Sequence, residues 1–218
     1  MTYNIAIDGP AGAGKSTIAK KIAKKLGYIY VDTGAMYRAM ALHLLREQIE
    51  PSETEKINVK CMEADISIGY ENGEQIVYLN GENVNGLIRT EEVGNMASAS
   101  SPNPNVRKKM VDLQQKLAAS ENVVMDGRDI GTCVLPNAQV KVYLTADSRV
   151  RAGRRYDELT QKGISCDFDT IEKDIIERDR QDMTREISPL KQAEDAKVID
   201  SSHMTIDEVV DTVIALVH

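Results

Sequence analysis

The stretch GPAGAGKST, from Gly9 to Thr17, decides the fold of this 218-residue chain. It matches the pattern GxxxxGK[ST], and it lies between an apolar run at residues 3–7 and a segment with apolar residues at helical spacing. Glycines let successive backbone N–H groups turn toward one phosphate group, while the following helix adds partial positive charge at its N-terminus. The stretch therefore predicts a strand, a phosphate-binding loop and a helix.

Two side chains of this loop carry chemistry of their own. Lys15 is expected to reach the β- and γ-phosphate oxygens of a nucleoside triphosphate, and the hydroxyl of Ser16 to ligate Mg²⁺. A glycine-rich turn with a surface lysine is the alternative, which the complete motif and both flanking elements disfavour. The loop does not by itself separate a kinase from a nucleotide-dependent switch. The expected ATP-binding residues here are Gly9, Pro10, Ala11, Gly12, Ala13, Gly14, Lys15, Ser16 and Thr17.

Composition narrows the class of protein further. With 42% hydrophobic and 28% charged residues and a net charge of −7, the chain is expected to be a single globular domain, over residues 1–218, that does not bind a nucleic acid polymer. It has neither an apolar run of about 18 residues nor a signal-like start, so we expect a cytoplasmic protein. A monomer is a separate expectation, which no motif supports. Three cysteines without metal-site spacing are expected to be reduced packing residues: Cys61, Cys133 and Cys166.

Short β-rich runs alternate with helical patterns along most of the chain. This alternation predicts an α/β fold of the P-loop NTPase type, with a parallel sheet covered by helices on both faces. The expected strands are residues 3–7, 28–32, 122–126, 140–144 and 197–200. The expected helices include residues 18–26, 35–47, 106–120, 151–163 and 165–185.

One region departs from the alternation. Residues 64–84 alternate apolar and polar side chains around the turn signals Asn72-Gly73 and Asn80-Gly81. Successive hairpins do not fit a βαβ crossover, so we expect a small antiparallel insertion over residues 64–88. One hypothesis is that this insertion sets how far an acceptor site opens.

Arginines concentrate late in the chain. Seven of the twelve lie between residues 149 and 185, together with nine acidic residues, so the region is no general basic patch. Individually placed guanidinium groups suit bidentate phosphate contacts, and the helix-loop-helix pattern predicts a lid at residues 151–170. The alternative for any one arginine is an ion pair on a solvated helix face.

The stretch MDGRDIG, residues 125–131, follows an expected strand. Asp126, Arg128 and Asp129 therefore emerge at the carboxyl end of a parallel strand, the edge where open α/β sheets bind ligands. The phosphate-binding loop is expected at the same edge. An Asp/Arg pair that stabilises a turn is the alternative.

Six stretches together carry a family resemblance. GPAGAGKST, DTGAMYR, IRTEEV, MDGRDIG, RRYDEL and ERDRQDMTR, in this order, resemble the bacterial cytidylate kinases, a family of nucleoside monophosphate kinases. The resemblance covers nearly the whole chain, including the hairpin-rich insertion. It implies transfer of the γ-phosphoryl group of ATP to CMP, with dCMP as a second acceptor, in pyrimidine nucleotide metabolism.

The resemblance also implies how the phosphates are held. Three guanidinium groups, which suit a dianionic acceptor phosphate, correspond to Arg38, Arg128 and Arg185. The lid arginines Arg154 and Arg155 would face the triphosphate of ATP. The catalytic residues implied are Lys15, Arg128, Arg154 and Arg185.

Base recognition is implied in the same way. Arg107 matches a donor to the O2/N3 edge of cytosine, and Asp129 an acceptor from the N4 amine, with Ser98 assisting. Uracil would point a carbonyl oxygen at that carboxylate, which predicts discrimination against UMP. The other implied acceptor contacts are Thr33 and Tyr37 beside the base and Arg178 and Asp182 at the ribose.

The chemistry of the acceptor removes the need for a general base. The second pKa of a phosphate group is about 6, so the attacking oxygen of CMP is already mostly ionised at neutral pH. The three histidines, at positions 43, 203 and 218, fall outside every motif, as expected for a reaction that needs no general base. A kinase acting on another acceptor, UMP or a hydroxyl compound, stays open; in the hydroxyl case Asp32 or Asp126 is the candidate base. A nucleotide-binding switch is the rival from another class.

Overall fold

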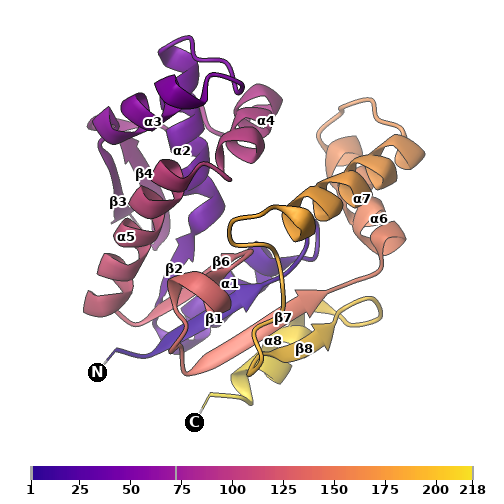
Figure 1. Ribbon diagram of the computed structural model, residues 1–218. Helices are drawn as coiled ribbons and strands as arrows, with labels where there is room; N and C mark the ends of the chain where they lie inside the picture. Colours follow the sequence, from indigo (N-terminus) through magenta and orange to yellow (C-terminus); the bar gives the residue numbers. More distant parts are fainter. Residues whose placement is uncertain (1, 72, 218) are drawn as a thin grey trace. The chain divides into compact units, whose positions relative to one another are not determined.

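The computed structural model describes residues 2–71 and 73–217, so Asn72 of the predicted turn and His218 lie outside the described residues. The chain divides into two compact units, each described by itself below (Figure 1). Unit 1 comprises Met1–Tyr30 and Asn122–His218, and unit 2 comprises Val31–Glu121. Along the described residues, no helix is both long and apolar enough to cross a membrane.

A five-stranded sheet organises unit 1. Its order is β2-β6-β1-β7-β8, with bounds Ile29–Asp32, Val123–Gly127, Asn4–Asp8, Val140–Thr145 and Lys197–Asp200. β1 pairs in parallel with β6 and β7, and β8 in parallel with β7, which confirms the predicted parallel sheet. The register sets Asp8 opposite Gly127, so the loops that follow β1 and β6 leave the sheet side by side.

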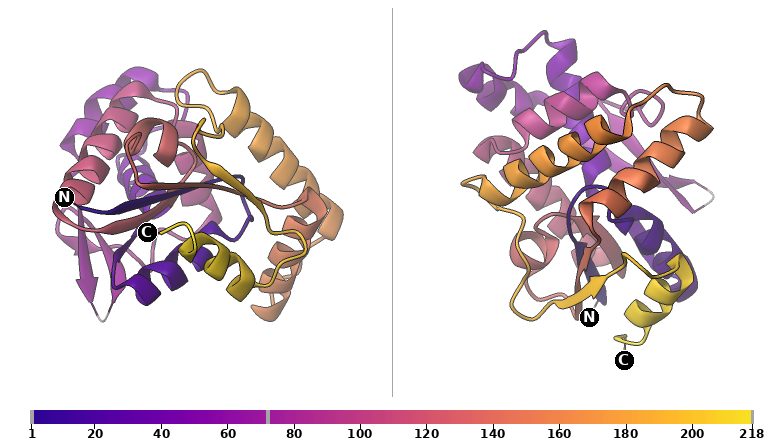
Figure 2. Two further views of the ribbon diagram at one scale, coloured as in Figure 1. Left: turned by 90° about the horizontal axis from the view of Figure 1, so that it is seen from below. Right: turned by 90° about the vertical axis from the view of Figure 1, so that its right-hand side faces the viewer.

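Helices cover this sheet on both faces, as predicted. α1 (Lys15–Leu26) and α8 (Ile206–Ile214) pack on one face, and the short π-helix η1 (Ile130–Val134) lies against β1 on the other (Figure 2, left). α1 buries Ile18 and Ile22 against the strands because these residues share one helix face, and it ends at Gly27 in the left-handed conformation. α6 (Ser148–Gln161) and α7 (Phe168–Thr184) pack together as the predicted helical pair (Figure 1).

Unit 2 combines helices with the small antiparallel sheet predicted from the hairpin signals. Its elements are α2 (Thr33–Arg46), α3 (Thr54–Glu63), β3 (Ile66–Glu71), β4 (Glu74–Leu79), β5 (Glu82–Asn83), α4 (Glu91–Ser100) and α5 (Pro104–Ser120). β4 pairs antiparallel with both β3 and β5. The core forms where α2 packs on α4, α5 and β4, with Met36, Met40 and Leu44 fully buried.

Four helices were not predicted: α3, α4, η1 and α8. α3 buries only Ile57 and Cys61, and α4 is rich in small residues, so neither presents a strong apolar stripe. η1 depends on contacts from a distant strand, described below. The cysteines are unbridged, as expected, but only Cys61 is a fully buried packing residue, since Cys133 and Cys166 are half-buried.

Candidate active site

The loop between β1 and α1 has the backbone of a phosphate-binding loop. Gly12 and Gly14 adopt positive φ angles of 75° and 87°, a region open to glycine at little cost. Gly9 is required for a different reason: a Cβ added there would lie 1.9 Å from the backbone oxygen of Leu144 in β7. The loop thus starts in direct contact with the sheet and curves into the N-terminus of α1.

Lys15, the first residue of α1, is buried, and its Nζ donates a hydrogen bond to the backbone oxygen of Pro10 at 2.7 Å. Burial lowers the pKa of Lys15 to about 7, and the nearby positive charge of Arg128 acts in the same direction. The carboxylates of Asp126 and Asp8 oppose this shift. A bound phosphate, as a further negative charge, would restore the charged ammonium.

Ser16 and Asp126 form a pair of oxygen donors beside the lysine. Ser16 Oγ donates to Asp126 Oδ2 at 2.9 Å, and the hydroxyl of Tyr30 donates to Asp126 Oδ1 at 2.9 Å. An oxygen pair of this kind next to a phosphate-binding loop fits Mg²⁺, which takes one or two protein ligands and completes its shell with phosphate and water. Within the described residues, no group of three or more His, Cys, Asp and Glu side chains is arranged for a metal.

The contact between Asp126 and Ser16 was not predicted from the sequence, where Asp126 was considered as a residue at the ligand-binding edge, as a turn residue or as a base. The available signal was NVVMD, an apolar strand that ends in aspartate directly beside the strand of the phosphate loop. An acidic residue at that point is typical of the second metal ligand in P-loop proteins.

Asp8 fixes the segment that carries the MDGRDIG residues. Its carboxylate accepts hydrogen bonds from the backbone N–H groups of Ile130 at 2.8 Å and Gly131 at 2.7 Å, the first turn of η1. Burial raises the pKa of Asp8 to about 6, although both hydrogen bonds favour the ionised form. Asp8 therefore ties this segment to the end of β1, next to the phosphate loop.

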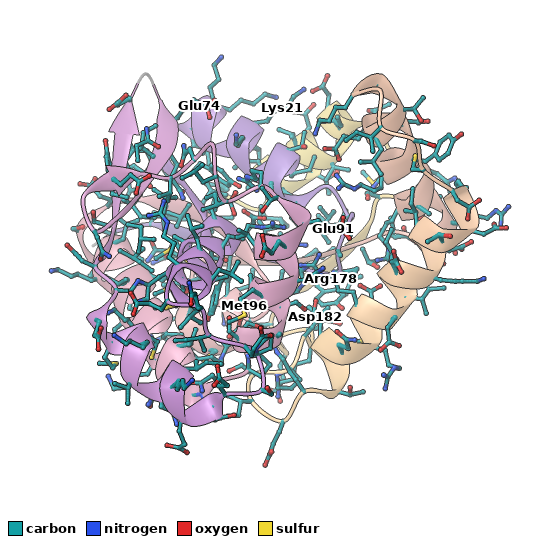
Figure 3. All side chains as sticks on the ribbon, turned by 90° about the horizontal axis from the view of Figure 1, so that it is seen from above. Lys21, Glu74, Glu91, Met96, Arg178 and Asp182 are labelled. Carbon is teal, nitrogen blue, oxygen red and sulfur yellow. The ribbon has the colours of Figure 1, made fainter. Side chains whose placement is uncertain are left out.

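Two of the predicted acceptor arginines meet in this part of unit 1. Arg128 Nε donates to Asp182 Oδ2 at 2.7 Å, and Arg185 makes longer ion pairs with Asp182 at 3.8 Å and with Asp129 at 3.7 Å. All four side chains are largely buried. Arg178 lies one turn before Asp182 on the same side of α7 (Figure 3) and is exposed. The carboxylates thus orient the arginines.

The two predicted lid arginines on α6 differ from each other. Arg154 reaches the phosphate loop, with Nη1 3.4 Å from the backbone oxygen of Ala13, and its Nη2 donates to the backbone oxygen of Ser201 at 2.8 Å. Arg155 is exposed and pairs with Glu158 at 2.8 Å. Both line a pocket of about 810 Å³ that opens beside the loop, a size that accommodates a nucleotide. Its other walls include Gly14, Lys15, Thr17, Ser201, Thr205 and Val209.

Unit 2 carries the remaining predicted acceptor residues. Arg107 is buried, with its guanidinium 5.9 Å from the centre of the Tyr37 ring. Arg38 Nη1 is 3.4 Å from the backbone oxygen of Ile88 and packs against Gly94 of α4. Thr33 is buried at the start of α2, and Ser98 is half-buried on α4. The predicted pairing of Arg107 with Asp129 joins residues of different units and stays a prediction.

Solved structures with the same fold define the class. A gluconokinase from Sinorhizobium meliloti matches with a TM-score of 0.51 and 14% identity, over 98% of this chain and 90% of that one. A shikimate kinase from Bacteroides thetaiotaomicron matches with a TM-score of 0.50 and 16% identity, over 98% and 97% of the two chains. At such identities the likeness concerns the fold alone. Together with the phosphate loop, it defines a P-loop protein with the fold of small-molecule kinases.

Sequence relatives narrow the class to one family. The family model described as cytidylate kinase matches residues 5–218. A cytidylate kinase from Caldicellulosiruptor bescii is 52% identical over 98% of this chain and 94% of its own length. Those from Shouchella clausii and Bacillus subtilis are 49% and 46% identical, over 99% and 98% of this chain and 96% of each relative. The chain belongs to the cytidylate kinase family, as its sequence motifs predicted.

Proposed function

We propose that the chain transfers the γ-phosphoryl group of ATP to CMP and dCMP, giving ADP and CDP or dCDP. The observation that carries the proposal is the juxtaposition within unit 1 of a phosphate loop and two acceptor arginines: the charge of Arg128 contributes to the lowered pKa of Lys15, and Arg128 and Arg185 share Asp182. Family membership fits the same reaction.

The reaction follows from positioning and charge neutralisation. Lys15 and the loop amides hold the β- and γ-phosphates of ATP, while Arg128 and Arg185 hold the phosphate of CMP. The attacking oxygen is already ionised, so no side chain has to accept a proton. Closure of α6 and α7 would exclude water and suppress hydrolysis of ATP.

The state of the two candidate bases disfavours a hydroxyl acceptor. Asp32 caps α2, accepting from the backbone N–H of Ala35 at 2.9 Å, and pairs with Arg89 at 2.7 Å. Asp126 is held by the hydroxyls of Ser16 and Tyr30. Neither carboxylate is arranged to take a proton from a substrate.

We propose that Mg²⁺ is held by Ser16 and Asp126. Bound there, the ion would offset the negative charge of the β- and γ-phosphate oxygens. Asp126→Asn weakens one ligand while preserving the shape of the site, so we expect the Mg²⁺ concentration for half-maximal rate to rise by about tenfold or more. An unchanged Mg²⁺ dependence would remove Asp126 from the metal site.

The decisive experiment is an ADP-release assay with ATP, Mg²⁺ and a panel of AMP, GMP, UMP, CMP, dCMP and dTMP. We expect CMP and dCMP to be used, with kcat/KM for UMP lower by about 10² or more, because uracil leaves the Asp129 carboxylate facing an oxygen. Asp129→Asn provides an amide donor for that oxygen and should narrow the ratio. Equal use of UMP and CMP by the unaltered protein refutes the roles given to Arg107 and Asp129.

We also propose that the protein acts as a monomer. Light scattering at assay concentrations should then give a mass near 24.1 kDa, and twice that mass would contradict the proposal.

A further inference from the structure

A buried ion pair joins α6 to α7 next to the phosphate loop. Arg151 Nη1 lies 2.7 Å from Asp179 Oδ2, and the two side chains are only 7% and 11% exposed. Desolvation offsets much of the attraction within such a pair, so burial alone does not explain its presence. The other hydrogen bonds of these two side chains indicate what the pair does.

Both members of the pair bind the backbone of Ala11 in the loop. Arg151 Nη1 donates to the backbone oxygen of Ala11 at 2.8 Å, and Asp179 Oδ1 accepts from its backbone N–H at 3.3 Å. Arg151 Nε donates to the backbone oxygen of Ala146, which anchors the guanidinium to the connection between β7 and α6. The contact is close, since a Cβ added to Gly12 would lie 3.2 Å from Arg151 Cβ.

The planarity of the peptide group gives these contacts a consequence. In a trans peptide, the C=O of one residue and the N–H of the next point in opposite directions. Arg151 holds the oxygen of Ala11, so the N–H of Gly12 is directed away from Arg151. Arg154, through the oxygen of Ala13, orients the N–H of Gly14 in the same way. An anion-binding nest requires successive amides that are held in fixed directions.

We propose that Arg151 and Asp179 are positioning residues of the phosphate loop, fixing the peptide groups on either side of Ala11 so that the loop amides face the phosphates of ATP. The N–H of Ala11 is then a donor to Asp179 and not to the nucleotide, although Ala11 was expected among the ATP-binding residues. The inference rests on the proposed function only in that the loop binds a nucleoside triphosphate. It specifies an effect on ATP and not on CMP.

The test compares this pair, which joins α6 to α7, with an exposed pair within α7. Arg151→Met, Arg151→Lys and Asp179→Asn are measured against Arg180→Met, which breaks an exposed ion pair with Glu177 on α7. Binding of Mg·ATP is followed by calorimetry without acceptor, KM for ATP and CMP by the ADP-release assay, and folding by thermal melts. Because charge-assisted hydrogen bonds orient the loop, we expect Arg151→Met to weaken ATP binding by about tenfold or more and to leave KM for CMP within about twofold.

Conservative variants separate positioning from stability. Asp179→Asn keeps an acceptor for the N–H of Ala11, and Arg151→Lys keeps the charge, so each should retain more ATP affinity than Arg151→Met. Combining Arg151→Met with Asp179→Asn should give less than the product of the single effects, because both act on one peptide unit. If ATP affinity is unchanged in folded variants with lowered melting temperatures, the pair is only structural and the proposal is overturned. Tight ATP binding by the unaltered protein without CMP turnover would instead contradict the proposed function alone.

Discussion

Six of the seven arginines between residues 149 and 185 fall into two groups that the sequence does not distinguish; the seventh, Arg178, is exposed. The inner group binds backbone carbonyls or buried carboxylates on other elements, and the side chains of Arg151 and Arg185 are 7% and 9% exposed. The outer group pairs with glutamates and is 49% to 71% exposed. The inner group is Arg151, Arg154 and Arg185, and the outer group is Arg149, Arg155 and Arg180.

The difference shows that the partner, and not the count, decides what an arginine does. Arg155 and Arg180 each pair with a glutamate three residues away on the same helix, and such exposed pairs contribute little to stability. Inner arginines connect elements far apart in the chain, so their loss disturbs the geometry of a loop or a cluster. The following predictions test this contrast.

The largest effect on activity is expected when the ammonium group of Lys15 is removed. Lys15→Met deletes the only charged side chain that the phosphate-binding motif itself provides for the transferred phosphoryl group. We expect kcat/KM for ATP to fall by about 10³-fold, as for loss of a main electrostatic stabiliser. Steady-state kinetics measures this, and a loss smaller than tenfold would contradict the role of Lys15. Thermal melts verify folding.

The contrast between inner and outer arginines is sharpest for Arg185 and Arg180. Arg185→Met should lower kcat/KM for CMP by about 10²-fold, because a guanidinium that neutralises the acceptor phosphate is lost. Arg180→Met should stay within about twofold, since it breaks only an exposed pair. Similar losses in both variants would mean that burial does not separate the two groups. Circular dichroism and melts establish whether each variant is folded.

The lowered pKa of Lys15 predicts a dependence on pH. Above about pH 7 the free protein loses the Lys15 proton, and bound phosphates restore it, so ATP binding at pH 8 should take up close to one proton, about 0.9. The affinity for ATP should then fall by up to about tenfold per pH unit above 7. Calorimetry in two buffers of different ionisation enthalpy measures the uptake, and Lys15→Arg, which stays charged, is the control. Equal binding heats in the two buffers would mean that no proton is taken up, and therefore that the pKa of Lys15 is that of an ordinary lysine.

The same pKa has a consequence for stability without ligand. The folded-state pKa of Lys15, about 7, lies below its ordinary value of 10.5, so the unfolded chain holds a proton that the folded chain lacks between these values. The contribution of Lys15 to the free energy of unfolding should therefore rise with pH from about 7 to 10.5. Lys15→Met should flatten that rise.

The smallest effect is expected in unit 2, at the contact between Gly94 and Arg38. A Cβ at Gly94 in α4 would lie 3.1 Å from Arg38 Nη1, so Gly94→Ala should displace this guanidinium slightly. Alanine also stabilises a helix interior by about 1 kcal/mol relative to glycine. We expect a higher melting temperature together with a KM for CMP raised by about two- to fivefold, as for a mildly misplaced phosphate ligand. An unchanged KM would show that Arg38 adapts or does not bind the acceptor.

Local patterns predicted most of the fold. The strand, loop and helix around Gly9 to Thr17, the parallel sheet and the antiparallel hairpins all followed from spacing and turn residues over short stretches. The phosphate-loop motif predicted that Lys15 and Ser16 follow the loop at the start of the helix, where the structure places them. The missing parts depend on pairs far apart in the chain: Ser16 with Asp126 is separated by 110 residues, and Ala11 with Asp179 by 168. The hydrophobic periodicity of short segments carries no information on such distant pairs. Another distant pair, Asp8 with Ile130, holds the first turn of η1.

The contact between Gly9 and the backbone of β7 has a practical consequence for genetics. Any side chain at this position meets the backbone oxygen of Leu144, part of the sheet itself, so substitutions should fail by preventing assembly of unit 1. In a mutational scan, Gly9 would then rank with the most intolerant core positions. Its intolerance would then reflect the contact between the phosphate loop and β7, and would carry no information on nucleotide binding.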